Sequence, residues 1–136
     1  MPIIDVTNIV NSKIEPLIEG SIDMDRNPIK IKRVVAVIVH TKEGYNIPHF
    51  HIKRDRMNDC CIMLNDNRFF NHGDNDSLLT SRECVLLDEW LRKINKSSKF
   101  GYNNWQVLAD MWNSRKEIQI DLSNQPDYSS IKQYKD

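Results

Sequence analysis

Two histidines, His49 and His51, stand two residues apart in the segment 46–53. On a β-strand, alternate side chains face the same side, so this spacing places both imidazoles on one face, roughly 6.5–7 Å apart. Phe50 and Ile52 would face the other side and anchor the strand to a core. Solvent-facing imidazoles at this spacing could converge on one phosphate, one substrate or one metal ion. Two such histidines can also serve no function, and that interpretation stays open.

Basic residues gather around the two histidines. Residues 30–56 contain seven Lys and Arg against two Asp and Glu. Metal-free phosphodiester cleavage needs a base, an acid and nearby cations for the charged transition state, so His49 and His51 are candidate catalytic residues. The same cations could instead form a solvated face of the sheet. The candidate phosphate or nucleic-acid ligands are Lys32, Arg33, Lys53, Arg54 and Arg56.

A metal site is a second interpretation of the histidine pair. His40 ends the preceding apolar run and is the best third ligand beside His49 and His51, whereas His72 and Asp74 belong to a more distant loop. A zinc-type centre needs at least three protein ligands. We therefore expect no cofactor, with a divalent metal ion on His40, His49 and His51 as the alternative.

A third interpretation is a binding protein without chemistry. The chain has 19 basic and 19 acidic residues, so no net charge steers it toward nucleic acid or a membrane. It contains no phosphate-binding glycine loop, dinucleotide fingerprint, nucleophile elbow or two-Cys, two-His zinc pattern. A small protein with an edge strand and polar loops can act by surface contact alone. The histidines would then be structural, or a pH-sensitive contact.

The histidines must be positioned by strands. The apolar run 34–39, within an expected strand at 29–41, is typical of a strand covered on both faces. A short loop at 42–46 leads into the histidine strand, which predicts an antiparallel hairpin. Residues 55–58 form the next turn and 60–64 the third strand. Strict alternation at 117–122 predicts a short edge strand.

Capping signals predict two helices after the strands. Thr80 with Glu83, and Asn103 with Gln106, match capping boxes. Asp88 lies four residues before Arg92, which favours an ion pair along the first helix. The expected apolar stripe of the first helix is Val85, Leu86, Trp90, Leu91 and Ile94. The expected inner face of the second helix is Trp105, Leu108, Ala109 and Trp112.

These elements predict an α+β fold with a mainly antiparallel sheet of three or four strands, packed on one face by two or three helices. Residues 29–122 would form a single α+β domain. Residues 1–28 would be an N-terminal extension, in which the apolar spacing over 2–19 fits an amphipathic helix that ends near Ile14. Residues 123–136 would be a polar, loosely held C-terminal tail.

The cysteines indicate in which cellular compartment the protein is expected. The chain has three, Cys60, Cys61 and Cys84. An odd count with two adjacent members does not form a disulfide framework, so we expect reduced, buried thiols. The N-terminal sequence shows no signal-peptide pattern, and the longest apolar run is too short to span a bilayer. We expect a cytoplasmic protein with no membrane partner.

The order of these pieces resembles an uncharacterised prokaryotic domain family. Its members combine a Pro-His-Phe-His-Val-type strand, a second strand, a helix with a Glu-Trp step and a final helix with an Asn-Trp step. The matching segments here are 46–52, 60–64, 85–91 and 104–112. The likeness covers residues 34–113, so residues 1–28 and the chain after Asn113 would be additions to the family's domain.

The resemblance implies a setting rather than an activity. Genes of such proteins often stand beside small partner genes in toxin–antitoxin-like pairs. We therefore expect a small intracellular prokaryotic or mobile-element protein that binds a macromolecular partner, a protein first and RNA second, in a toxin–antitoxin-like or defence-related setting. The functional surface would be the face of His49 and His51. The alternative is a metal-free RNase-like or a metal-dependent enzyme that uses the same two residues.

Overall fold

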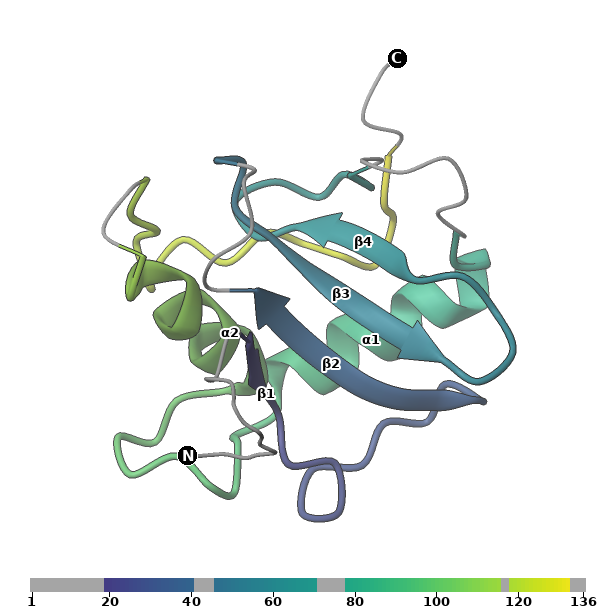
Figure 1. Cartoon of the computed structure of the whole chain (residues 1–136), viewed down its shortest axis with the longest axis horizontal. Helices are drawn as coiled ribbons and strands as arrows, with labels where there is room; N and C mark the ends of the chain where they lie inside the picture. The colour runs from purple at the N-terminus through teal and green to yellow at the C-terminus, as the bar shows by residue number, and fades with distance from the viewer. Residues whose placement is uncertain (1–18, 41–45, 71–77, 116–117, 133–136) are drawn as a thin grey trace, which may run out of the picture.

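The computed structural model describes residues 19–40, 46–70, 78–115 and 118–132. The described strands form one antiparallel sheet in the order β1-β2-β3-β4, and two helices cross behind it (Figure 1). This arrangement confirms the predicted α+β class. The elements are β1 (Glu19–Ser21), β2 (Val34–His40), β3 (His49–Arg54), β4 (Cys60–Met63), α1 (Ser81–Arg92) and α2 (Asn104–Asn113).

The strand that carries the histidines is central in this sheet. β3 pairs with β2 on one side and β4 on the other, and His51 lies opposite both Ile38 and Cys61. Directly paired residues point to the same face, so these three side chains share one face of the sheet. Phe50 and Ile52 point to the other face, as the alternation predicts.

The face of Phe50 and Ile52 packs against the helices and forms the main core. Trp105 and Trp112 from α2 are fully buried in it, and each buried large apolar side chain contributes roughly 1.5–3 kcal/mol. The indole N–H of Trp105 donates to the carbonyl oxygen of Leu64 at 3.1 Å. Sheet and helix are thus joined by apolar packing and by a buried hydrogen bond.

Both helix starts are as predicted. The Glu83 backbone N–H donates to Thr80 Oγ1 at 3.2 Å, and the Thr80 backbone N–H donates to Glu83 Oε1 at 2.9 Å. Asn103 and Gln106 exchange the equivalent bonds at 2.8 and 3.0 Å. Each cap removes unsatisfied N–H groups from a helix end, a contribution of about 1 kcal/mol.

The buried residues of α2 are those that the sequence predicted, whereas the buried residues of α1 differ in part from the predicted ones. All four predicted inner residues of α2 are fully buried. In α1 the predicted stripe is partly wrong, because Val85 and Ile94 are exposed. The buried positions of α1 are Cys84, Leu87, Trp90 and Leu91, three or four residues apart on one side of the helix. The Asp88–Arg92 pair is present at 2.9 Å.

The C-terminal segment packs onto the sheet, so the expected loose tail is wrong for residues 123–132. Tyr128 is fully buried, and its hydroxyl donates to the carbonyl oxygen of Met63 at 2.6 Å. Its backbone N–H donates to Asp88 Oδ1 at 2.9 Å. The expected edge strand at 117–122 is also absent over residues 118–122. There the Asn113 side chain bonds both backbone groups of Ile120, which replaces strand pairing.

The outer edge of β4 is paired rather than open. The Phe70 N–H donates to the carbonyl oxygen of Cys61 at 2.8 Å, and the Met63 N–H donates to that of Arg68 at 2.9 Å. Lys132 in turn forms a parallel bridge with Arg68. Phe69 and Phe70 are buried, which confirms that they plug the core from this connection.

The opposite edge contains a strand that the sequence does not predict. Residues 19–21, expected in the N-terminal extension, form β1 beside β2. A Cβ atom at Gly20 would lie 2.7 Å from Met111 Sδ, so glycine allows β1 to approach α2. The expected helix ending near Ile14 lies outside the described residues, as does the expected loop at 42–46 except for Asn46. No helix in the described ranges is long and apolar enough to cross a bilayer.

Candidate functional site

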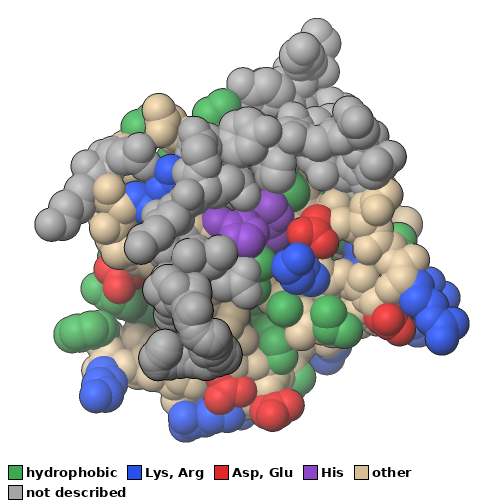
Figure 2. All heavy atoms as spheres, in the orientation of Figure 1, with side chains coloured by type: hydrophobic (Ala, Val, Ile, Leu, Met, Phe, Trp, Pro, Cys, Tyr) green, Lys and Arg blue, Asp and Glu red, His purple; other side chains and the backbone are tan. Residues whose placement is uncertain are grey.

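The two central histidines are buried, which corrects the prediction that they face solvent. His49 is 1% exposed and His51 is 3% exposed. Strand alternation predicts which residues share a face, but not whether that face is covered. Figure 2 shows histidine side chains gathered at one place on the molecule, with an acidic and a basic side chain beside them.

The structure brings together the three histidines that were predicted as a site. The rings of His40 and His51 lie 4.5 Å apart between centroids and almost perpendicular, and those of His49 and His51 lie 5.1 Å apart. Phe70 and Trp112 contact the His49 ring at 4.6 and 5.8 Å. His49 is therefore enclosed largely by aromatic side chains, as in a core position.

Polar contacts orient the two buried imidazoles. His49 Nδ1 lies 2.6 Å from the carbonyl oxygen of Ile47, and because a carbonyl only accepts, Nδ1 carries the proton. His51 Nδ1 lies 3.4 Å from Asp59 Oδ2 and 3.3 Å from Cys61 Sγ. The Lys53 ammonium contacts the same Asp59 oxygen at 3.3 Å. The buried His51 is thus coupled to an ion pair that reaches the surface.

A metal centre receives no support from the described part of the chain. Within it, no group of three or more His, Cys, Asp or Glu side chains is placed to hold a metal ion. Two of the more distant candidates, His72 and Asp74, lie outside the described residues. A zinc-type site needs three or four ligands whose donor atoms converge on one point, and the described residues show no such group.

Two of the predicted phosphate ligands have structural partners instead. The Arg54 side chain is buried; its Nη2 donates to the carbonyl oxygen of Leu78 at 3.2 Å and its Nη1 lies 3.8 Å from Glu83. Arg54 therefore ties the end of β3 to the start of α1. Lys53 is engaged by Asp59. The buried Arg54 is not accessible to an external phosphate, whereas the Lys53 side chain is 41% exposed although it pairs with Asp59.

Three other predicted ligands remain together at the surface, and we call Lys32, Arg33 and Arg56 the basic corner. All three are exposed, and the Arg56 side chain is 87% exposed. The Asp55 N–H donates to the carbonyl oxygen of Arg33 at 2.8 Å, which joins the two segments of the corner. The structure thus brings together residues that are more than twenty positions apart.

The backbone of the basic corner is unusual. Arg33 has φ +70° and Arg56 has φ +61°, in the left-handed region that glycine and asparagine favour. An arginine there costs on the order of 1 kcal/mol. Val35 and Met57 are exposed beside these arginines, and Val35 is 60% exposed although it belongs to the apolar run of β2. Neither the left-handed backbone at these arginines nor the exposure of Val35 could be predicted from the sequence pattern.

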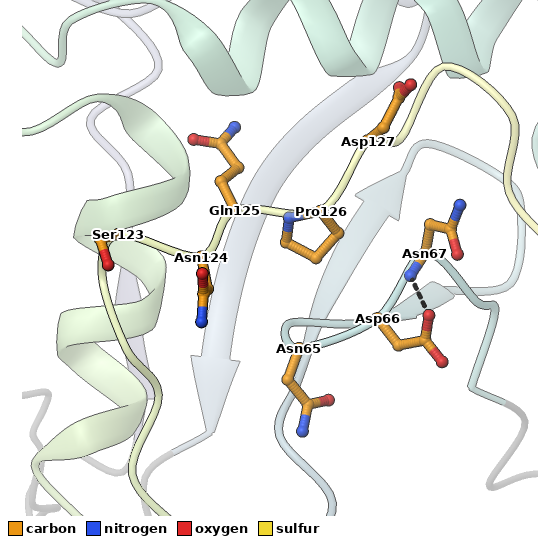
Figure 3. A pocket seen from close by; sticks show the side chains of 8 residues that line it. All are labelled: Asn65, Asp66, Asn67, Ser123, Asn124, Gln125, Pro126 and Asp127. Carbon is orange, nitrogen blue, oxygen red and sulfur yellow. Dashed lines mark hydrogen bonds between the residues drawn. The ribbon is translucent and has the colours of Figure 1, made fainter.

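A polar groove of about 450 Å³ lies between the C-terminal segment and the turn after β4 (Figure 3). Its carboxylates serve internal contacts: Asp66 pairs with Arg68 at 3.0 Å, and Asp127 accepts from the Oγ and N–H of Ser129. These bonds lower the pKa of the Asp127 carboxyl. The Asn67 side chain donates to the carbonyl oxygen of Ser130. We therefore interpret the groove as part of the contact between the C-terminal segment and the sheet, and not as a binding site.

Comparison with known proteins returns no match among protein-family models, curated proteins or solved structures. What the protein does must therefore be inferred from its own surfaces. Two features stand out among the described residues, namely a buried histidine cluster and an exposed basic corner. They differ in the one property that contact with another molecule requires, which is access from solvent.

Proposed function

We propose that this chain acts by binding a protein partner, as a small intracellular prokaryotic or mobile-element protein in a toxin–antitoxin-like or defence-related setting. The observation that carries the proposal is the basic corner, where two arginines occupy the left-handed backbone region and remain exposed. Strained positions that persist in a fold cluster at functional sites. The proposed setting rests on the resemblance of segments 46–52, 60–64, 85–91 and 104–112.

The composition of the basic corner favours a protein over RNA. Val35 and Met57 are exposed beside Arg33 and Arg56. Arginine and methionine are enriched at the centres of protein interfaces, where apolar contact and charged hydrogen bonds combine. Single-stranded RNA is instead held by exposed aromatic rings on which bases stack, and the residues named here include none. The expected partner surface is acidic around an apolar patch.

The burial of the histidines supports binding over catalysis. At 1% and 3% exposure, His49 and His51 have almost no surface that a macromolecular substrate could touch. A general acid or base must come within hydrogen-bond reach of the proton that it transfers. The cluster instead has the features of a polar structural element on the second face of the sheet.

The proposal is tested by co-expression with the product of the gene adjoining this one in its native genome. We expect the two proteins to co-purify, and the double variant Arg33→Glu/Arg56→Glu to lose the partner because it reverses the charge of the corner. The matched control is Lys93→Glu/Lys96→Glu, which reverses the same number of exposed charges just after the C-terminal end of α1, away from the basic corner. The control should retain the partner.

Three outcomes would overturn the proposal. One is a neighbour product that does not associate at all when both are expressed in soluble form. The second is equal loss of binding in both double variants, which would indicate a nonspecific charge effect. The third is retention of RNA, with release of bound material by nuclease, which would make RNA the ligand of the corner.

A further inference from the structure

A groove of about 370 Å³ lies away from the basic corner, between the end of β1 and the loop that joins α1 to α2. In Figure 1 this loop lies at the lower left, whereas the turn between β3 and β4 lies at the right. Ser21, Ile22 and Asp23 form one wall, the loop forms the second, and α2 forms the third with Val107, Asp110 and Met111.

The loop beside this groove is held by its own hydrogen bonds. Ser98 Oγ accepts from the backbone N–H groups of Phe100 and Tyr102 at 3.2 and 3.1 Å. The Asn95 N–H donates to the carbonyl oxygen of Tyr102 at 2.8 Å. Gly101 turns the chain at φ +72°, a conformation that suits glycine. These hydrogen bonds give the loop a defined conformation.

This shaped loop presents an aromatic ring to solvent. Phe100 is 78% exposed, the highest fraction among the large apolar side chains described. Its ring lies 5.4 Å from that of Tyr102, and both residues line the groove. Core packing does not account for a phenyl ring in this position, and exposed apolar groups beside a cavity mark interaction sites.

The charged side chains that line the groove are two carboxylates and one ammonium group. Asp23 and Asp110 are exposed carboxylates that line the same groove, against one cation, Lys99. Asp23 is held in place, because its Oδ1 accepts from the backbone N–H groups of Asp25 and Arg26. Aromatic faces next to carboxylates attract a flat cation, which stacks on the ring and donates to the oxygens.

We infer that this groove binds an arginine side chain of a partner protein, with Phe100 and Tyr102 contacting the guanidinium plane and Asp23 and Asp110 pairing with its edge. Arginine fits better than lysine, because its planar group can stack and donate at once. This site is separate from the basic corner, and the inference does not depend on the proposed function. Lys99 opposes the ligand's charge and so offers a way to test the assignment.

The test uses the full ¹⁵N-labelled chain and two probes, N-acetyl-arginine amide and the neutral isostere N-acetyl-citrulline amide. We expect amide shifts with the arginine probe at residues 98–102 and near Asp23 and Asp110, and much weaker shifts with citrulline. Phe100→Ala should weaken binding about two- to fivefold. Asp110→Asn should also weaken it, and Lys99→Gln should strengthen it.

Val35→Ala is the matched control, because it removes an exposed apolar side chain elsewhere and should leave binding unchanged. Since Phe100 is exposed, Phe100→Ala should keep the wild-type melting temperature, so loss of binding would not reflect unfolding. Absence of shifts, or equal shifts with citrulline, would overturn the inference. So would concentration-dependent shifts without probe that vanish in Arg33→Ala/Arg56→Ala, because the occupant would then be a second copy of this chain.

Discussion

His51 illustrates how a residue that looks catalytic in the sequence can serve the fold. It lies in the central strand, contacts His40 and His49 by its ring, and has Asp59 and Cys61 within 3.4 Å of Nδ1. Nearly every side of the imidazole is thus in contact with the protein. Removing it would leave a cavity and deprive buried polar groups of their neighbour.

We therefore expect His51→Ala to lower the free energy of unfolding by about 2–3 kcal/mol, measured by urea denaturation. The control is Lys53→Ala, which removes the half-exposed partner of the same carboxylate and should cost less than about 1 kcal/mol. If His51→Ala folded with unchanged stability and yet abolished the biological activity, the histidine would be a functional residue after all.

A second prediction at this scale concerns Asp127. The Ser129 hydroxyl, and then its backbone N–H, lower the pKa of the Asp127 carboxyl. A lowered pKa means stabilisation that is present above the unfolded pKa and is lost as the pH falls through the folded pKa. In an NMR titration of the carboxyl carbons, Ser129→Ala should raise the pKa of Asp127 toward its ordinary value.

Asp121 is the internal control for that titration. Its pKa is lowered in the same way by the hydroxyl and N–H of Ser123, in a separate turn. The Asp121 pKa should stay low in Ser129→Ala and rise in Ser123→Ala. A shift of both carboxyls in either variant would indicate a global effect rather than the local hydrogen bonds.

At the scale of elements, prediction from sequence succeeded where a local signal exists. β2 follows from its β-branched run, β3 and β4 follow from short apolar-rich segments bounded by turn residues, and both helices begin at the predicted caps. β1 has only three residues, which is too short to show the alternation of apolar and polar residues that indicates a strand. Its position also depends on the close approach of Gly20 to Met111, which the sequence does not reveal. The segment 123–132 has no periodic pattern either, and Tyr128 is its one buried residue.

The prediction for this segment concerns the hydroxyl group of Tyr128. Tyr128→Phe keeps the ring but removes the hydroxyl, which leaves the partly buried carbonyl oxygen of Met63 without that donor. We expect a loss of about 1–2 kcal/mol in thermal or urea unfolding. The Tyr-to-Phe control is Tyr102→Phe, at a tyrosine that is only partly buried, and it should be nearly neutral. A neutral Tyr128→Phe would mean that apolar packing alone holds the segment.

At the scale of the whole molecule, zero net charge conceals an uneven distribution. The basic corner, with Arg33 and Arg56, lies at one end of the sheet, and the groove with Asp23 and Asp110 lies beside the loop between the helices. Composition reveals neither region, because the total is balanced. The sequence predicted the cations at the corner, whereas the groove depends on β1, the loop and α2 meeting in space.

The fold class could be predicted from the sequence better than the candidate site, because the fold class follows from local patterns and the site depends on tertiary packing. Periodicity and caps are properties of neighbouring residues, so the α+β arrangement follows from them. The burial of His49 and His51 depends on what covers a sheet face, and the partner of Arg54 is Glu83 in a helix nearly thirty residues away. Accessibility decides between a structural and a functional residue, and it is a property of the assembled molecule.

The pairing along the outer edge of β4 has a consequence for shortened forms of this protein. Residues 68–70 bond to β4, and Lys132 bonds to them in turn. A chain cut before residue 128 would lose Tyr128 and this last bridge, and the hydrogen-bonding groups along the edge would lose part of their cover. Bare strand edges recruit strands from other molecules. Proteolytic trimming of the C-terminus would therefore be expected to produce insoluble aggregates, and storage of intact chains would require protection from proteases.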